Sequence, residues 1–441
     1  MTISPENLGR QLDLFPSPPS FLFRHLTPRL PMLDAAPQEI AYLHTPQAIR
    51  DRCGQLFALA CEDRLDHFRC RLNRLSATAN FVIQVMREKY PTMDIPFHSR
   101  WRHFEVNGAS RLSQLTAELG QWSPLDIAKM KIDLAITSVL LDAGAGDQWR
   151  YVEPITGKVF RRSEGLAIAS FHLFRQGAFS SHSDHPWQAD ARGLQQLTAA
   201  KLTGGFQASP ENALVGIDGR LKLLQRLGKA LLSHPDFFGS DTPRPGNLVL
   251  YLKSLAKEGQ LSTNQILQTL LEGLGDIWPG RIAIADVNLG DVWRHPKLPV
   301  TDLGSQLVPF HKLSQWLTYS LLEPLQELGL EITNLDALTG LAEYRNGGLC
   351  VDLGLLEPKH SQVTRDRHRP DSAVIVEWRA LTVILLDQIA DAMRQKLNLS
   401  STELPLAKIL QGGTWAAGRH IAAQLRSGLP PIQIESDGTV F

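Results

Sequence analysis

A group of side chains capable of acid–base and ion-pair chemistry interrupts an apolar run between residues 338 and 356. Glu343, Tyr344 and Arg345 lie among leucines spaced as on a buried helix face, and Gly347-Gly348 follow. This pattern predicts two short helices that meet at the glycine pair, with Glu343 and Arg345 at their junction. Burying a carboxylate and a guanidinium costs free energy unless they pair or bind a ligand. A ligand site and an internal Glu343–Arg345 ion pair both fit the segment.

A second polar stripe lies just upstream. Pro309 suits a first helical turn, so we expect a helix over about 310–329, kinked at Pro324. Polar side chains recur at helical spacing on one face of it, and the apolar ones form the other face. The polar candidates are His311, Lys312, Gln315 and Tyr319. They suit hydrogen bonding to a small polar ligand, with a solvated helix face as the alternative. We expect the stripe to face Glu343 and Arg345 across a pocket between helices.

Two further segments combine aromatic and charged side chains. One lies between Gly290 and Pro296 and the other between Ser99 and Phe104. Functional groups gathered in a loop favour ligand binding. Structural roles explain them equally well. In the first segment the acid can hydrogen-bond the backbone of a turn, and in the second the aromatic rings can be buried as the anchor of a loop. The candidate ligand-binding residues are Asp291, Trp293, Arg294 and His295 in the first segment and Trp101 and Arg102 in the second.

Arginines also precede a predicted helix that begins at about residue 164. Arg161 and Arg162 lie directly before it, with Ser163 and Glu164 at its start. A helix N-terminus with arginines beside it attracts anions. Ordinary capping accounts for Ser163 and Glu164 without a ligand.

Composition and motifs exclude several classes of protein. Lys+Arg and Asp+Glu both total 45, so the chain lacks the basic excess typical of nucleic-acid binding. No apolar run is long enough for a bilayer, and no secretory signal begins the chain, so we expect no membrane association and a cytoplasmic location. The four cysteines show no zinc-type spacing, and no nucleotide-binding loop appears. We therefore expect no cofactor and no metal, although His182, Asp184 and His185 leave a metal reading open.

The periodicity predicts a mainly α fold with small β-hairpin additions. We expect helices over 46–60, 63–89, 110–120, 124–143, 164–176, 191–203, 219–233, 246–257, 263–273, 310–329, 334–343, 374–398 and 414–426. A hairpin is predicted over 151–161 and an extended piece over 431–441. Residues 1–45 are expected to form an extended, Pro-rich arm, and residues 46–441 a single α-helical domain.

Longer stretches of the chain resemble the uracil-catabolism protein family, formerly a domain of unknown function. The resemblance runs from about residue 20 to the last residue. Its motifs are 130–147, 162–167, 290–295, 307–320 and 436–441. It implies a cytoplasmic role in a route by which microbes draw nitrogen from uracil, through ribosylurea-type intermediates and with release of urea.

A more distant resemblance links two segments to the queuosine-salvage nucleoside glycosidases, which are α-helical and related in shape to helical DNA glycosylases. Ala342-Glu343-Tyr344-Arg345 is similar to their signature, with Glu343 in place of an aspartate and Asn346-Gly347 in place of Pro-Gln. Lys312 and Gln315 match their Lys-x-x-Gln helix. Their following aspartate falls on Ser320 here, so Glu343 or Asp291 would have to carry that charge.

Together these observations favour a hydrolase that breaks the N–C1′ bond of a ribosylurea-type nucleoside or nucleotide. Such a reaction needs a carboxylate opposite the positive charge that develops on the sugar, and an acid for the departing nitrogen. The candidates are Glu343 and Asp291 for the carboxylate, His311, Lys312 and His295 for the acid, and Arg345, Arg294 and Arg102 for a phosphate.

Two alternatives come from other functional classes. A metal-dependent amidohydrolase that opens a ureide would bind its metal near His182 and His185. A non-catalytic protein of the same pathway would bind the ligand without turning it over. The expected partner is in each case a small molecule, a nucleoside or a ribotide, and the sequence does not indicate an oligomeric state.

Overall fold

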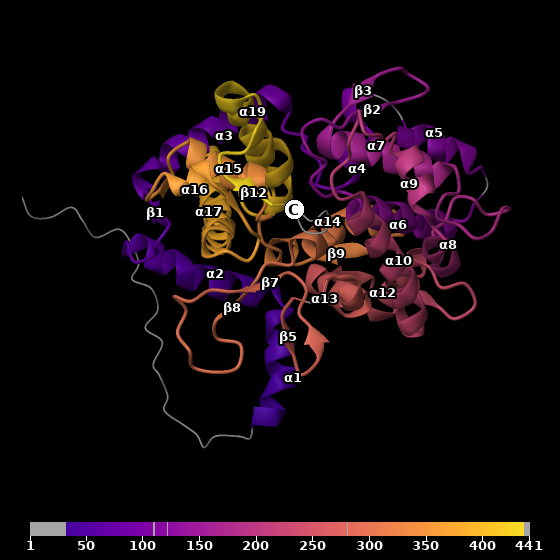
Figure 1. The fold of residues 1–441 in the computed structure, drawn as a ribbon, viewed down its shortest axis with the longest axis horizontal. Helices are drawn as coiled ribbons and strands as arrows, with labels where there is room; N and C mark the ends of the chain where they lie inside the picture. The colour runs from indigo at the N-terminus through magenta and orange to yellow at the C-terminus, as the bar shows by residue number, and fades with distance from the viewer. Residues whose placement is uncertain (1–31, 109–110, 121, 280, 436–441) are drawn as a thin grey trace, which may run out of the picture.

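Apolar residues at helical spacing fold most of the chain into helices (Figure 1). The computed structural model describes residues 32–108, 111–120, 122–279 and 281–435. The helices are α1 Met32–Leu43, α2 Pro46–Cys61, α3 Leu75–Lys89, α4 Trp101–Phe104, α5 Arg111–Glu118, α6 Pro124–Leu140, α7 Arg162–Arg175, α8 Ala191–Gln195, α9 Ala199–Gly205, α10 Ile217–Ser233, α11 Pro235–Phe238, α12 Leu248–Leu255, α13 Thr263–Leu274, α14 Lys312–Glu327, α15 Tyr344–Asp352, α16 Gln362–Arg365, α17 Ala373–Leu397, α18 Leu406–Lys408 and α19 Trp415–Arg426. A π-helical turn, Ile409–Thr414, joins α18 to α19.

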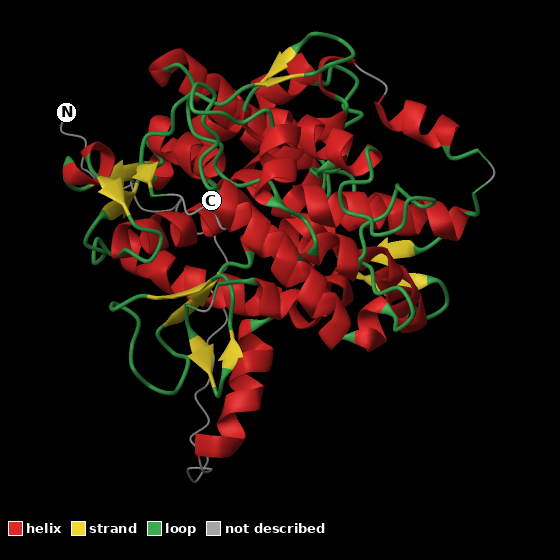
Figure 2. Cartoon of the chain, turned by 45° about the vertical axis from the view of Figure 1, so that its right-hand side comes forward, coloured by secondary structure: helices red, strands yellow, loops and turns green. Residues whose placement is uncertain are grey.

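The strands are short and pair two by two around this helical body (Figure 2). They are β1 Phe68–Cys70, β2 Tyr151–Val152, β3 Val159–Phe160, β4 Gln260–Ser262, β5 Ala283–Ile284, β6 Val287–Asn288, β7 Val292–Arg294, β8 Leu307–Pro309, β9 Glu331–Thr333, β10 Leu356–Pro358, β11 Arg367–His368 and β12 Gln433–Ile434. The predicted hairpin is present, because β2 pairs antiparallel with β3 and Tyr151 lies opposite Phe160. The mainly α fold with small β additions is thereby confirmed.

A continuous apolar core joins the helices into a single domain. It extends from Ile49 on α2 to Ile432 near the end of the described chain. α17 packs against α2 and α3, and α14 packs against α6. Figure 1 shows α15, α17 and α19 on one side, α4 to α10 and α12 on the other, and α14 between them. This central position places the start of α14 where both sides can contribute to one site.

Two predicted helices differ from the structure. Residues 63–74 contain β1 and a 3₁₀ turn, and the helix begins only at Leu75. Residues 338–343 are not helical: the carbonyl oxygens of Ala337 and Leu338, which a helix would use internally, accept hydrogen bonds from the Arg50 guanidinium. The chain therefore enters α15 in an extended conformation.

The glycine pair of the site segment was predicted to separate two helices, and this prediction was wrong. Gly347 and Gly348 both lie inside α15. A Cβ atom on Gly347 would lie 2.7 Å from the Trp378 ring, and one on Gly348 would lie 3.1 Å from Pro431. The glycines let α17 and the C-terminal segment pack closely against α15.

The expected N-terminal arm is only partly within the described residues. Residues 1–31 lie outside them, and Met32–Leu43 form α1 rather than an extended chain. No helix in the described ranges is long and apolar enough to cross a membrane.

Candidate functional site

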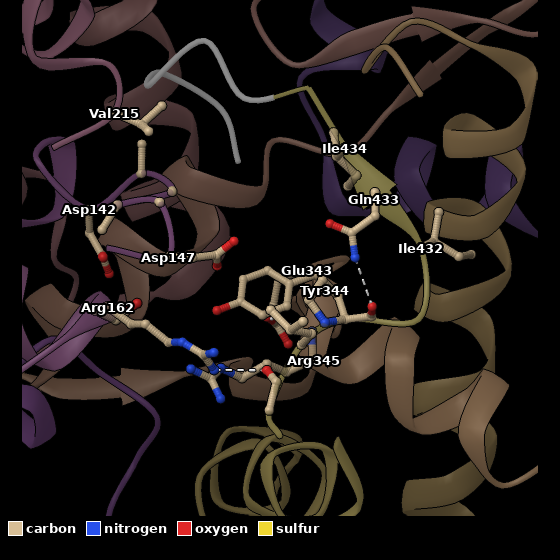
Figure 3. A pocket seen from close by; sticks show the side chains of 18 of the residues that line it. Asp142, Asp147, Arg162, Val215, Glu343, Tyr344, Arg345, Ile432, Gln433 and Ile434 are labelled. Carbon is tan, nitrogen blue, oxygen red and sulfur yellow. Dashed lines mark hydrogen bonds between the residues drawn. The ribbon is translucent and has the colours of Figure 1, made fainter. Parts of the chain in front are cut away.

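A cavity of about 530 Å³ lies where the start of α14 meets α15, α19, the loop after α6 and the C-terminal segment (Figure 3). Its volume is in the range typical of small-molecule sites. Charged, aromatic and backbone groups from distant parts of the chain line it. They include His98, His103, Asp142, Asp147, Arg162, Ser163, Lys312, Trp316, Glu343, Tyr344, Arg345, Arg367, Trp415 and the segment 428–434.

Glu343 lies at the N-cap of α15. Its carboxylate accepts hydrogen bonds from the backbone N–H groups of Arg345, at 2.9 Å, and Asn346, at 2.6 Å. A carboxylate is favoured at this end of a helix by the unsatisfied N–H groups and the helix dipole. Burial nevertheless raises the pKa of Glu343, and the N–H and cation of Arg345 together with Lys312 oppose that rise. The carboxylate has room for a further partner, because two donors do not exhaust its lone pairs.

Arg345 is buried and has no carboxylate partner among the described residues. Its side chain is 6% exposed, and its guanidinium lies 5.3 Å from the Tyr344 ring and 5.2 Å from the Trp415 ring. Nη2 has no hydrogen-bond partner among the described residues. The ion pair with Glu343 that the sequence allowed is absent from this part of the chain, where Glu343 contacts the backbone N–H of Arg345 instead. The guanidinium packs against the Tyr344 and Trp415 rings and borders the cavity.

Lys312 is the first residue of α14 and projects from the other wall. It is 9% exposed, and burial lowers its pKa while the Glu343 carboxylate opposes that change. Its backbone N–H donates to the Asp291 carboxylate at 3.0 Å. The preceding His311 has φ +46°, a left-handed conformation that is unusual for a non-glycine residue. The start of α14 is therefore fixed from outside the cavity, and its cation is directed inward.

Acidic groups line the wall formed by the loop after α6. Asp142 is paired with the buried Arg100 at 2.7 Å, whereas Asp147 is exposed. Figure 3 shows both carboxylates on the side that faces the Tyr344 ring, with Gln433 on the C-terminal segment opposite. The cavity thus has carboxylates on two walls, one from this loop and one from Glu343.

Arg162 connects α7 with the C-terminal segment. It is the first residue of α7, has φ +53°, and donates from Nη1 to the Gly428 carbonyl at 2.8 Å (Figure 3). The segment from Gly428 to Ile434 forms a wall of the cavity and is held at its end by the pairing of β11 with β12. This pairing also brings Arg367 to the rim.

Aromatic rings form the remaining wall. His103 lies edge-on to Trp316 at 5.6 Å and to Trp415 at 5.5 Å, and His98 stacks on Trp316 at 6.2 Å. Burial holds the pKa of His103 well below its usual value and lowers that of His98 to about 4, so both imidazoles are neutral. Gln411, in the π-helical turn before α19, hydrogen-bonds His98. Flat, neutral rings of this kind suit a planar ligand group.

Of the residues predicted from sequence, the structure brings Glu343, Tyr344, Arg345 and Lys312 to the cavity. The rest of the helical stripe does not reach it. His311 hydrogen-bonds the Leu43 carbonyl, and Gln315 and Tyr319 hydrogen-bond Thr339. The polar stripe therefore packs against the chain's own loops, and Lys312 and Trp316 are the α14 residues that face Glu343 and Arg345.

The candidate residues of the two aromatic and charged segments also lie away from the cavity lining, although His103 of the second segment is part of it. Asp291 forms a two-pronged ion pair with Arg379 and accepts from the Trp293 indole. The other candidates have structural partners: Arg294 contacts Gln306, His295 lies 3.4 Å from Glu377, the Trp101 indole donates to the Ser320 carbonyl, and Arg102 pairs with Glu323. Asp291 still affects the site, because it accepts the first N–H of α14.

Several cavity residues were not predicted as site residues. Asp142 and Asp147 flank Gly144 and Gly146, and two acids on a glycine-containing loop after a buried helix were the signal that could have indicated them. Arg162 was noted only as part of a helix start. His98, Trp415 and the C-terminal segment carry no local pattern, because only the tertiary fold brings them together.

His182 and His185 line a different cavity, next to Trp122 and Trp187. Within the described ranges, no group of three or more His, Cys, Asp or Glu side chains is placed to hold a metal ion. In the described structure, His182 and His185 thus have no third side chain of this kind placed to complete a metal site.

Comparison with known proteins identifies relatives over most of the chain. Residues 42–441 match the model of a family described as a protein of unknown function (DUF1688). The chain is 42% identical over 419 residues to Protein urg3 of Schizosaccharomyces pombe, covering 92% of this chain and 99% of that protein. It is 37% identical over 440 residues to Uracil catabolism protein 4 of Lachancea kluyveri, covering 91% and 99%. The predicted resemblance is confirmed: the chain belongs to the DUF1688 family, with Protein urg3 and Uracil catabolism protein 4 among its relatives.

Proposed function

We propose that the protein acts in uracil catabolism as a hydrolase of the N-glycosidic bond of a ribosylurea-type nucleoside or nucleotide. The name of the Lachancea relative, Uracil catabolism protein 4, supports the pathway. The observation that carries the reaction is a cavity lined by both a half-buried carboxylate, that of Glu343, and a buried lysine, Lys312. Groups of opposite charge with shifted pKa values in a cavity are typical of acid–base sites.

Glu343 has the properties needed on the sugar side of the bond. As the C1′–N bond breaks, its electron pair leaves with the nitrogen and positive charge develops on the sugar. The Glu343 carboxylate stabilises that charge and takes a proton from the water whose oxygen bonds to C1′. Its two backbone hydrogen bonds hold the carboxylate in place, so little reorganisation is needed.

Lys312 has the properties needed on the leaving-group side. The departing urea nitrogen needs a proton, and Lys312 supplies one from its ammonium group. Because burial lowers the pKa of Lys312, this ammonium is a stronger acid than an exposed lysine. The products are urea and the free sugar, and the proton that Glu343 accepted restores the Lys312 ammonium.

The rest of the cavity suits the remaining parts of such a substrate. The neutral rings of His98, His103, Trp316 and Trp415 form a wall against which a planar ureide can pack. The buried Nδ1 of His103 and Nε1 of Trp316 have no hydrogen-bond partner among the described residues. Unsatisfied buried polar groups of this kind are typical of functional sites.

The proposal is tested by incubating the purified protein with ribosylurea and with pyrimidine ribonucleosides, each with and without a 5′-phosphate, while free sugar, urea and ammonia are measured. Release of sugar and urea in equal amounts is expected from ribosylurea or its 5′-phosphate. Release of ammonia first would support the ureide amidohydrolase, and saturable binding without any release would support the non-catalytic pathway protein. Either result would overturn the hydrolysis proposed here.

A further inference from the structure

We infer that the substrate carries a phosphate group, which binds between Arg345 and Arg162 at the start of α7. The inference deepens the proposed function and relies on it for the reaction, whereas the anion site depends only on the charges that line the cavity. It makes the substrate a ribotide rather than a riboside.

The strongest indication is a buried guanidinium nitrogen of Arg345 that has no hydrogen-bond partner among the described residues. Two other buried arginines have acidic partners: Arg100 pairs with Asp142 at 2.7 Å, and Arg111 pairs with Glu153 at 2.7 Å. The buried Arg220 instead donates to backbone carbonyl groups from all three of its guanidinium nitrogens. Arg345 is 6% exposed, lies on two aromatic rings, and has an unpartnered Nη2 among the described residues. A buried donor without a hydrogen-bond partner is unfavourable. A ligand anion in the adjoining cavity would accept a hydrogen bond from it.

Arg162 places a second guanidinium on the same cavity. In the described structure its side chain donates to a carbonyl, that of Gly428, and not to a carboxylate. It begins a helix of 14 residues, and Ser163 beside it also lines the cavity. The N–H groups at a helix start and the helix dipole favour phosphate. Glu164, the acid of this first turn, is paired with Arg419.

In the described part of the chain, the acids on the cavity form no ion pair with these arginines. Asp142 is already paired with Arg100, and Glu343 binds backbone N–H groups at the start of α15. Asp147 is exposed. Arg367 adds a further cation at the rim. Two guanidiniums and a helix start provide several donors, which matches the three terminal oxygens of a phosphate better than a single carboxylate.

Binding is measured on the full chain by isothermal titration with ribose 5-phosphate, ribose and inorganic phosphate. None of these ligands has a bond that the proposed reaction cleaves, so the result does not depend on turnover. Ribose 5-phosphate is expected to bind at least about tenfold more tightly than ribose, because charge-assisted hydrogen bonds are added. Inorganic phosphate is expected to compete with it.

Arg345→Gln and Arg162→Gln are expected to remove this preference, each leaving ribose affinity nearly unchanged. Arg162→Gln keeps the test valid if Arg345→Gln fails to fold. Arg102→Gln is the matched control: Arg102 is paired with Glu323 outside the cavity, and its loss should leave the preference intact.

Equal affinity for ribose and ribose 5-phosphate would overturn the inference, as would a preference that survives both cavity substitutions. Hydrolysis of ribosylurea and its 5′-phosphate at equal efficiency would also overturn it while leaving the proposed function standing. Conversely, preferential binding of ribose 5-phosphate without turnover of either substrate would support the anion site and count against the hydrolase.

Discussion

Glu343→Gln separates a chemical role of this carboxylate from a structural one. Gln keeps the size of the side chain and removes its charge. If Glu343 stabilises positive charge on the sugar, kcat should fall about 100- to 1000-fold, the effect of losing one preorganised electrostatic group. Glu323→Gln, at an acid paired with Arg102 outside the cavity, should leave kcat unchanged.

The stability change expected from the structure is small. Glu343 accepts two backbone N–H bonds as the N-cap of α15, and a Gln oxygen can replace only part of this cap. Loss of such a cap costs about 1 kcal/mol. In a chain of 441 residues this corresponds to a decrease of about 1 °C in Tm. Loss of a buried ion pair with Arg345 would instead cost about 3–5 kcal/mol.

The pH dependence of the Tm difference between Glu343→Gln and the wild type provides a second readout. Burial raises the pKa of Glu343 in the folded protein above its value in the unfolded chain. Glu343 therefore contributes to folding stability at pH values below its unfolded pKa, and this contribution is lost as pH rises through its folded pKa. Gln does not titrate. The Tm of the variant relative to the wild type should therefore increase as pH rises above about 4.5. An unchanged kcat together with a Tm lowered by several degrees would refute the catalytic role.

Three other perturbations have distinct expected outcomes. Lys312→Met should lower kcat about 100-fold or more, because it removes the proton donor. Its Tm, measured by calorimetry, should stay the same or rise because a buried cation is removed. A lower Tm with full activity would contradict this role. Asp291→Asn should destabilise the protein by about 3–5 kcal/mol in denaturant titration, because it removes one charge of the buried Asp291–Arg379 ion pair. Turnover should survive prolonged dialysis against a chelator, and a loss restored only by zinc would favour the ureide hydrolase.

Local sequence signals predicted most helices well, since the features that begin and end a helix are close in sequence. Ser123, Pro124 and Asp126 predicted the start of α6, where Ser123 caps the backbone N–H of Asp126. The segment before α15 was mispredicted, because Arg50, far away in the sequence, takes the carbonyl groups that a helix would have used. Contacts of this kind have no local signature.

The candidate site was predictable only in part for a similar reason. Glu343 and Arg345 stood out as polar residues at apolar positions and Lys312 as part of a polar stripe, and all three line the cavity. Gln315 belongs to the same stripe, yet it hydrogen-bonds Thr339. Sequence shows that a buried polar group needs a partner but not whether a ligand or a loop provides it. Arg162 and the C-terminal wall depend on tertiary contacts.

The fate of the urea carbon in a single turnover tests the central claim most directly. Ribosylurea 5′-phosphate and ribosylurea labelled with ¹³C at the carbonyl are incubated with the protein, and the products are followed by ¹³C NMR. Cleavage at C1′ predicts that the label appears as urea in step with the free sugar, and that Glu343→Gln suppresses both signals. Label appearing as bicarbonate, with the sugar still bound to nitrogen, would contradict N-glycosidic hydrolysis.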